Sequence, residues 1–232
     1  MNDLLTRSPQ LSRNEVIAGW SYYAFSMLAL PIVLAYVNGL LPQPMNEARL
    51  NFVFYAANFF ACILIFRRLL KLNLQIAVRR VFPVVWYGLL GYLGYSALTG
   101  ILTALLQILV PGFANVNDMS IASLAGKELT LMAIGTVFLV PVAEELFYRG
   151  LMLRHLAGKS RILAYCVSMG VFALVHVVGY IGLYDPLTLA LCFIQYLPAG
   201  YCLAWCYAST GTIVTPILMH MIVNAYGLAN LR

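Results

Sequence analysis

The chain has 232 residues, of which 62% are hydrophobic and only 9% are charged, whereas about 25% of the residues of a soluble domain are charged. A soluble fold of this length could not bury so much apolar surface, which excludes a disordered chain, a coiled coil and an ordinary cytosolic enzyme. We therefore predict an all-α, polytopic transmembrane helix bundle, because a helix bonds its backbone polar groups internally, as lipid requires.

The formal net charge of +6 raises the question of nucleic acid as a partner. The lysines and arginines lie between apolar runs and form no single exposed basic face, which argues against nucleic-acid binding. We instead expect the lipid bilayer to surround the chain, with basic residues at the ends of the membrane spans.

Seven apolar runs follow a polar start. Residues 1–18 are mixed and polar, without the short apolar run and small-residue cleavage site of a signal peptide. The third apolar run is longer than the roughly 20 residues that a bilayer requires, so it is either tilted or contains an eighth element. We predict spans at residues 19–40, 50–66, 82–110, 129–152, 162–183, 187–207 and 212–228.

The basic residues predict the orientation. With a cytoplasmic N-terminus and seven alternating spans, eleven lysines and arginines fall inside and three outside, as the positive-inside rule requires. We therefore expect a multi-pass protein of the cell membrane with its N-terminus in the cytoplasm. The inside set is Arg7, Arg13, Arg67, Arg68, Lys71, Arg79, Arg80, Arg149, Arg154, Lys159 and Arg161, and the outside set is Arg49, Lys127 and Arg232.

Ionisable side chains are rare within the apolar runs, and each one is therefore informative. Such a group is costly in a membrane helix and marks a functional site by default. The set comprises Glu144, Glu145 and Arg149 in the fourth span, His176 in the fifth and His220 in the seventh, with Asn224 one turn after His220.

In the fourth span, Glu145 and Arg149 are four residues apart, so they share a helix face and can form an ion pair. This spacing is at least as typical of a structural pair as of a catalytic one. Glu144 is rotated by about 100° from Glu145 and has no adjacent partner, so we expect it to face a cavity and to act as a general base.

Two mechanisms fit these residue types, and the residues alone do not choose between them. In the first, Glu144, His176 and His220 bind a divalent metal such as zinc, because two histidines and a carboxylate form a ligand set of zinc hydrolases. In the second, no cofactor is needed. Glu144 and His176 hold and deprotonate a water molecule, and His220 and Asn224 donate hydrogen bonds to the oxyanion of amide hydrolysis.

Three motifs occur in order on separate apolar runs: EExxxR at 144–149, FxxxH at 172–176 and HxxxN at 220–224. This set resembles the CAAX-protease and bacteriocin-processing family, also called the Abi family, which includes the endoprotease that trims prenylated proteins. The motifs lie between residues 144 and 224, about a third of the chain. The resemblance implies an all-helical intramembrane endopeptidase whose cavity opens toward the cytoplasm.

The resemblance also implies roles for single residues. Glu144 would activate the water with the assistance of His176, and His220 and Asn224 would stabilise the oxyanion. The supporting residues that would hold the site together are Glu145, Arg149 and Phe172.

The implied substrate is a membrane-associated or lipidated protein or peptide, either a prenylated protein or a bacteriocin-like peptide. The alternative is a non-catalytic immunity or peptide-binding protein of the same fold, against which the intact Glu144, His176 and His220 argue. A small transporter is a third hypothesis, but the internal duplication expected of one is not evident in the sequence.

We expect the chain to divide into a cytoplasmic segment at 1–18, N-terminal transmembrane helices at 19–128 and a catalytic transmembrane core at 129–232.

Overall fold

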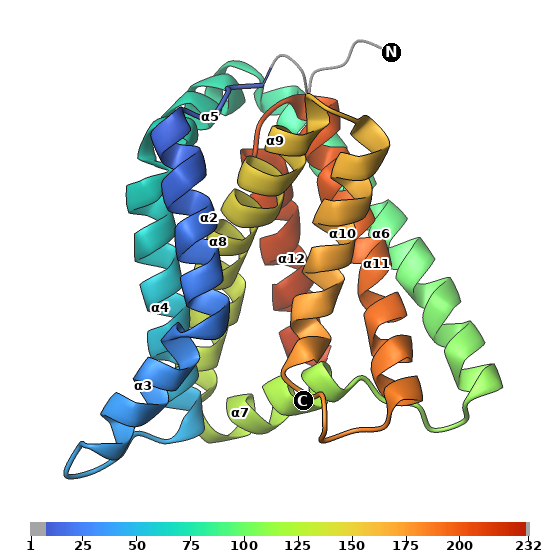
Figure 1. Ribbon diagram of the computed structural model, residues 1–232. Coiled ribbons are helices and arrows are strands. Elements are labelled where there is room, and N and C mark those ends of the chain that lie inside the picture. Colours follow the sequence, from blue (N-terminus) through green and yellow to red (C-terminus); the bar gives the residue numbers. More distant parts are fainter. Residues whose placement is uncertain (1–7, 231–232) are drawn as a thin grey trace.

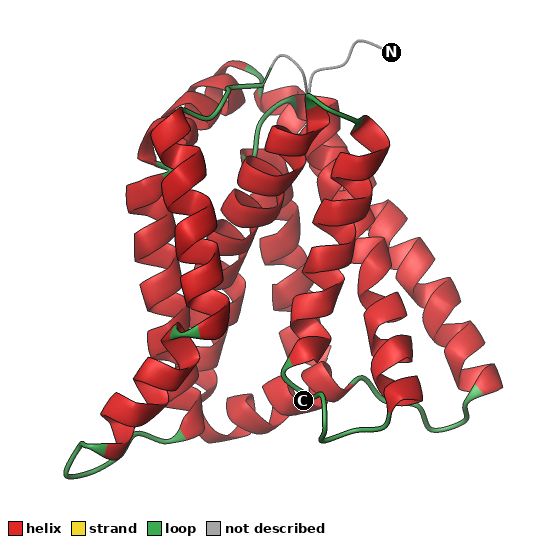
Figure 2. Cartoon of the chain, viewed as in Figure 1, coloured by secondary structure: helices red, strands yellow, loops and turns green. Residues whose placement is uncertain are grey.

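The computed structural model describes residues 8–230, and every regular element in this range is a helix (Figures 1 and 2). The helices pack side by side in one bundle, which confirms the predicted all-α transmembrane class. In chain order they are α2 (Arg13–Leu28), α3 (Leu30–Gly39), α4 (Glu47–Ile65), α5 (Arg67–Arg79), α6 (Val81–Leu109), α7 (Val116–Ala133), the π-helix η1 (Ile134–Leu139), α8 (Val140–Glu145), the π-helix η2 (Leu146–Leu153), α9 (Arg154–Ala157), α10 (Arg161–Val178), α11 (Pro186–Thr210) and α12 (Val214–Asn230).

Within the described residues, five helical stretches are long and apolar enough to cross a membrane, and a sixth is added if the bent pair α2 and α3 forms one span. The seventh predicted span corresponds to α12, which at 17 residues is slightly shorter than the others. The long third run is one helix of 29 residues, α6, so it hides no eighth element. Each predicted span therefore overlaps a helix or a continuous set of helices, but the fifth, at 162–183, extends beyond α10, which ends at Val178.

Side-chain caps set several helix starts. Ser12 and Glu15 form a capping box at the start of α2, and Ser160 accepts a hydrogen bond from the backbone of Leu163 at the start of α10. These side chains satisfy backbone N–H groups that have no partner within the helix. Gly211 ends α11 with φ of 71°, a left-handed conformation that glycine adopts without strain.

The basic stretch between the second and third predicted spans forms α5 rather than a loop. Its buried residues Leu69, Asn73 and Ala77 recur every four positions on one face, while its arginines and Lys71 are exposed. An amphipathic basic helix of this kind suits the surface of a membrane. In Figure 1, α5 crosses one end of the bundle, the end at which α9 also lies.

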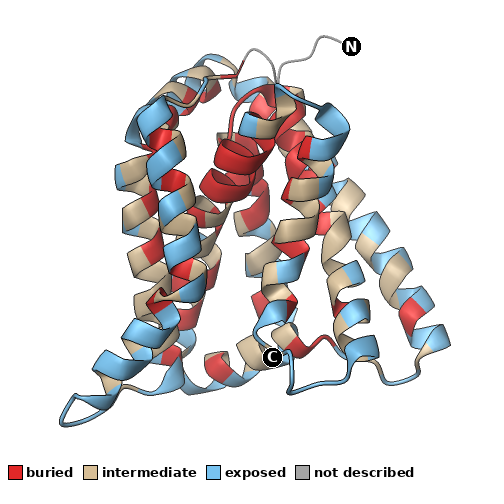
Figure 3. Cartoon of the chain, in the orientation of Figure 1, coloured by how far each residue is buried: buried red, intermediate tan, exposed pale blue. Residues whose placement is uncertain are grey.

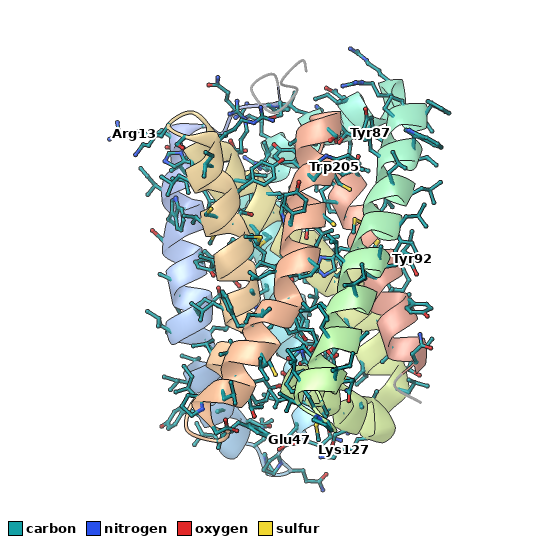
Figure 4. The ribbon with its side chains drawn as sticks, turned by 90° about the vertical axis from the view of Figure 1, so that its right-hand side faces the viewer. Arg13, Glu47, Tyr87, Tyr92, Lys127 and Trp205 are labelled. Carbon is teal, nitrogen blue, oxygen red and sulfur yellow. The ribbon has the colours of Figure 1, made fainter. Side chains whose placement is uncertain are left out.

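The two ends of the bundle differ in charge. We call the end with α5, α9 and the start of α2 the basic end, and the end with the start of α7 and the end of α12 the acidic end. Figure 4 shows Arg13 at the first, and Glu47 and Lys127 at the second. Among the described residues, the basic end carries nine basic side chains (Arg13, Arg67, Arg68, Lys71, Arg79, Arg80, Arg154, Lys159 and Arg161) and one carboxylate (Glu15), and the acidic end carries two basic side chains (Arg49 and Lys127) and four carboxylates (Glu47, Asp118, Glu128 and Asp185).

Gly91 of α6 faces Cys206 of α11 and Met219 of α12 at close range. A Cβ atom at this position would overlap Cys206 Sγ and lie 3.0 Å from Met219 Sδ, whereas a Cβ at Gly100 on the same helix would meet nothing within 4 Å. We conclude that packing requires a glycine at position 91 and not at position 100.

We expect Gly91→Ala to lower the free energy of unfolding by about 1–3 kcal/mol, the range for overpacking a well-filled interface. Gly100→Ala is the matched control, because both substitutions bring the same gain in helix propensity. Thermal unfolding of the two purified variants in detergent would test this, and equal midpoints would contradict the packing role of Gly91.

Candidate active site

The helix that carries Glu144 is bent and locally widened. Glu128 has non-helical angles, φ of −146° and ψ of 66°, so the first part of α7 lies across the acidic end before the chain turns into the bundle (Figure 1). The bend coincides with the predicted start of the core at residue 129. The π-helices η1 and η2 flank α8, and such wide turns within helices are frequent at functional sites. Pro141 in α8 cannot donate the usual backbone hydrogen bond, and the wide turn of η1 directly precedes it.

Glu144 and His176 lie at a similar depth. The helical stretch runs to Ala157 rather than to residue 152 as predicted. Thirteen residues separate Glu144 from its end, or at most about 20 Å at the α-helical rise of 1.5 Å per residue, because the wider π-helix η2 rises less. His176 follows the start of α10 at Arg161 by 15 residues, or about 22 Å. Both candidate residues are therefore far from the basic end of the bundle.

Glu145 and Arg149 form the predicted ion pair, and the structure extends it. Both side chains are fully buried, with Arg149 Nη1 3.0 Å from Glu145 Oε1. Arg149 Nη2 also donates to the carbonyl of Gly200 at 2.9 Å, and its guanidinium lies 4.8 Å from the ring centre of Phe172. The pair therefore joins the Glu144 helix to α10 and α11.

Glu145 also binds His220, a contact that sequence spacing did not predict. His220 Nδ1 lies 2.9 Å from Glu145 Oε1. This contact holds the ring so that its other nitrogen, Nε2, lies 3.9 Å from Glu144 Oε2. Glu145 is thus a positioning residue for His220 as well as the partner of Arg149.

Glu144 faces a cavity, as predicted. Its side chain is 21% exposed, whereas that of Glu145 is completely buried. Glu144 Oε2 has no hydrogen-bond partner among the described residues. This oxygen is buried, and a buried polar atom without a partner needs an explanation; its position near His220 Nε2 points to a place in the site rather than in the packing.

His176 is oriented by the backbone of its own helix. Its Nδ1 lies 2.7 Å from the carbonyl oxygen of Phe172, and because a carbonyl only accepts, Nδ1 carries the hydrogen. In the neutral ring, Nε2 then has a free lone pair. The ring also stacks on Tyr196 at 4.1 Å between centroids, which fixes its plane. Phe172 thus contributes a carbonyl to His176 and a ring face to Arg149.

The side-chain amide of Asn224 is held by a hydrogen bond from one of its two N–H groups. Its Nδ2 donates to the carbonyl of Thr136 in η1 at 2.8 Å. The second N–H of the same amide is not used by this contact. Asn224 and His220 lie one turn apart on α12 and can therefore direct donors to the same point.

All four predicted catalytic residues line a single cavity of about 410 Å³: Glu144, His176, His220 and Asn224. The basic end of the bundle, by contrast, is filled by apolar side chains, and every residue of η2 is buried. Figure 3 shows this concentration of buried residues around η2. The cavity therefore occupies the other half of the molecule, from the middle of the bundle to the acidic end.

A polar network lines the acidic end of the cavity, and sequence reasoning did not assign it to the site. Tyr196 OH donates to Asp118 Oδ1 at 3.0 Å and accepts from Asn117 Nδ2 at 2.8 Å. Asn115 Nδ2 donates to Gln195 Oε1 at 2.9 Å. An amide in the apolar sixth span, Gln195, is the signal that could have indicated this network.

The zinc interpretation does not fit this arrangement. Among residues 8–230, no group of three or more histidine, cysteine, aspartate or glutamate side chains is placed to hold a metal ion. The Nδ1 contacts of His220 with Glu145 and of His176 with the Phe172 carbonyl leave both Nε2 atoms free, so the spacing of the side chains, and not their hydrogen bonds, argues against a ligand set. Glu144, His176 and His220 therefore share a cavity without forming a ligand set.

The fold and the site together define a multi-pass helical membrane protein with a polar cavity inside its bundle. Residues 126–226 match the family described as type II CAAX prenyl endopeptidase Rce1-like. The chain therefore carries a domain of this family of membrane endopeptidases. The match spans all three motifs and confirms the family that they predicted. Neither a search of curated proteins nor a search of solved structures found a match.

Proposed function

We propose that the chain is an intramembrane endopeptidase that hydrolyses a peptide bond of a membrane-associated or lipidated protein or peptide. The observation that carries this proposal is the cavity, in which Glu144, His176, His220 and Asn224 from three separate helices converge. The Rce1-like domain supports the same class of reaction.

Glu144 is the general base of the proposed reaction. Its carboxylate, which is partly exposed to the cavity, accepts a proton from a water molecule, while the free lone pair of His176 Nε2 accepts a second hydrogen bond from that water. The water oxygen then attacks the carbonyl carbon of the scissile peptide bond. Glu144 passes the proton to the leaving nitrogen as the C–N bond breaks.

His220 and Asn224 are the proposed oxyanion donors. With both ring nitrogens of His220 protonated, Nδ1 donates to Glu145 and Nε2 donates into the cavity. The N–H of Asn224 that is not bound to Thr136 supplies the second donor. Fixed donors of this kind stabilise the charge that develops in the transition state. The catalytic residues are held in place by three positioning groups, which are Glu145, Arg149 and Phe172.

We expect Asn224→Ala to lower kcat by about 10²–10³-fold, the usual loss for one oxyanion donor. KM should change little, because this contact forms mainly in the transition state. Steady-state cleavage by the purified variant, with its thermal stability measured alongside, would test this. A variant that folds normally and keeps kcat within a few-fold of the wild type would remove Asn224 from the mechanism.

The proposed activity is tested by comparing peptide termini in membranes of cells that express the chain at matched levels as wild type or as Glu144→Gln. New termini that occur only with the wild type would support proteolysis and would identify the substrate, whether prenylated protein or bacteriocin-like peptide. Identical termini, with both proteins folded and present, would instead favour a binding or immunity protein of the same fold.

A further inference from the structure

A second hollow lies along α5, apart from the cavity that Glu144 lines. It has a volume of about 560 Å³ and shares no lining residue with that cavity. Seven of its eight lining residues belong to α5, and the eighth, Ile63, belongs to the last turn of α4. We call this hollow the α5 groove. Because α5 crosses the basic end of the bundle (Figure 1), the groove lies at that end.

The apolar part of the α5 groove is a stripe along the helix. Leu70, Leu74 and Val78 recur every four residues and therefore share one face. Leu74 and Val78 are exposed, whereas the stripe that precedes this one by a single residue is buried. The apolar surface continues along α4 at Phe60 and Leu64, which are also exposed. The rest of the described chain leaves this surface uncovered, and lipid acyl chains are the apolar partner that a membrane offers it.

Three basic side chains line the same groove. Arg67 and Lys71 lie one turn apart near α4, and Arg79 lies at the other end of α5. All three are exposed, and none pairs with a carboxylate among residues 8–230. Arg68, by contrast, pairs with Glu15 and is not part of the lining. Since α5 itself contains no aspartate or glutamate, the groove offers positive charge without a counter-ion of its own.

We infer that the α5 groove binds an anionic phospholipid, whose phosphate lies between Arg67 and Lys71 and whose acyl chains contact the apolar stripe. Guanidinium and ammonium groups both donate to phosphate oxygens. A zwitterionic lipid carries a cation of its own beside the phosphate, so unpaired basic residues discriminate against it. The orientation predicted from the lysines and arginines places α5 at the cytoplasmic leaflet, whose anionic lipids attract basic helices. Lipid binding of this kind is independent of the proposed peptidase activity.

The helix that carries the groove also holds the start of α12. The side-chain oxygen of Asn73 accepts a hydrogen bond from the backbone N–H of Ile213 at 2.8 Å, and the backbone carbonyl of Asn73 accepts one from the Thr212 hydroxyl at 2.9 Å. These two residues directly precede α12 at Val214. A lipid that binds only the folded chain stabilises it by mass action, so occupancy of the groove should raise the thermal midpoint.

Lipid binding would be measured by native mass spectrometry on the purified chain in a neutral detergent, with phosphatidylglycerol and phosphatidylcholine of identical acyl chains. We expect the wild type to prefer phosphatidylglycerol. The Arg67→Gln/Lys71→Gln variant should bind it about 30-fold more weakly, at about 1 kcal/mol for each basic side chain, while its binding of phosphatidylcholine changes little.

The matched control is Arg13→Gln/Lys159→Gln, which removes the same charge from two exposed residues of the basic end that lie outside the groove. This control should keep the affinity for phosphatidylglycerol within a few-fold of the wild type. Equal losses in the two double variants would mean that general surface charge attracts the lipid, and would overturn the inference. A wild type without preference for phosphatidylglycerol would overturn it as well.

Two further measurements separate a lipid site from a site for a small anion. Leu74→Gln keeps every charge but interrupts the apolar stripe, and we expect it to weaken phosphatidylglycerol binding several-fold in a folded chain, because Leu74 is exposed. It also tests the groove if the double variant does not fold. Phosphatidylglycerol should raise the thermal midpoint of the wild type, whereas inorganic phosphate at the same concentration should not. Unchanged affinity of the Leu74→Gln variant, or equal stabilisation by inorganic phosphate, would contradict a lipid site.

Discussion

Replacing Glu144 with glutamine should reduce peptide hydrolysis by about 10²–10⁴-fold, the contribution of a general base, while the protein remains folded. A carboxamide has nearly the size of a carboxylate but cannot accept a proton from water. Glu144 Oε2 has no hydrogen-bond partner among the described residues, so the substitution breaks no structural hydrogen bond at that atom. The loss should appear in kcat and not in the yield of protein.

The measurement is the cleavage rate of an identified substrate by purified protein in proteoliposomes, together with the thermal midpoint. Glu47→Gln is the matched control, because Glu47 forms a surface pair with Lys127 and its side chain is 75% exposed. Such pairs contribute about 0–1 kcal/mol, so this control should be fully active. A folded Glu144→Gln variant with more than about a tenth of the wild-type rate would exclude Glu144 as the base, given that range.

Replacing Arg149 with alanine should destabilise the protein by about 3–5 kcal/mol, the effect of removing one partner of a buried ion pair. The substitution removes the donors to Glu145 and to the Gly200 carbonyl, and leaves the Glu145 carboxylate fully buried. We expect a lower yield in membranes and a lower thermal midpoint in detergent. The matched control is Arg68→Ala, whose partner Glu15 is buried but whose own side chain is half-exposed, so its effect should be smaller.

A double variant separates stability from chemistry. Adding Glu145→Ala to Arg149→Ala removes the unpaired charge, so part of the lost stability should return. Activity should not return, because Glu145 also holds His220 at 2.9 Å. A stable but inactive Arg149→Ala single variant would give a different answer, namely that Arg149 acts in the reaction itself.

Local spacing predicted the parts of the site that depend on one helix. Glu145 and Arg149 pair because residues four apart share a helix face, and Glu144 faces the cavity because the next residue is rotated by about 100°. His220 and Asn224 share a face for the same reason. These statements needed no knowledge of which helices are neighbours.

Contacts between helices were not predictable in this way. Nothing in the spacing indicates that Glu145 binds His220, that Gly200 accepts from Arg149 or that Tyr196 stacks on His176. Each joins residues more than 15 positions apart, and such pairs depend on how whole helices pack. The extra length of the Glu144 helix was missed because hydropathy ends near residue 152 while the helix continues through basic residues to Ala157.

The amino-acid sequence by itself determined the membrane class and the helical runs, because composition and periodicity are properties of single segments in lipid. Its three motifs indicated the family and a set of candidate site residues. Only the tertiary structure decided that those residues share one cavity, that they do not form a metal-ligand set and that the cavity reaches the acidic end. The physical reason is that a cavity is bounded by side chains from several helices. Its position follows from where packing is complete, around η2, and where it is not.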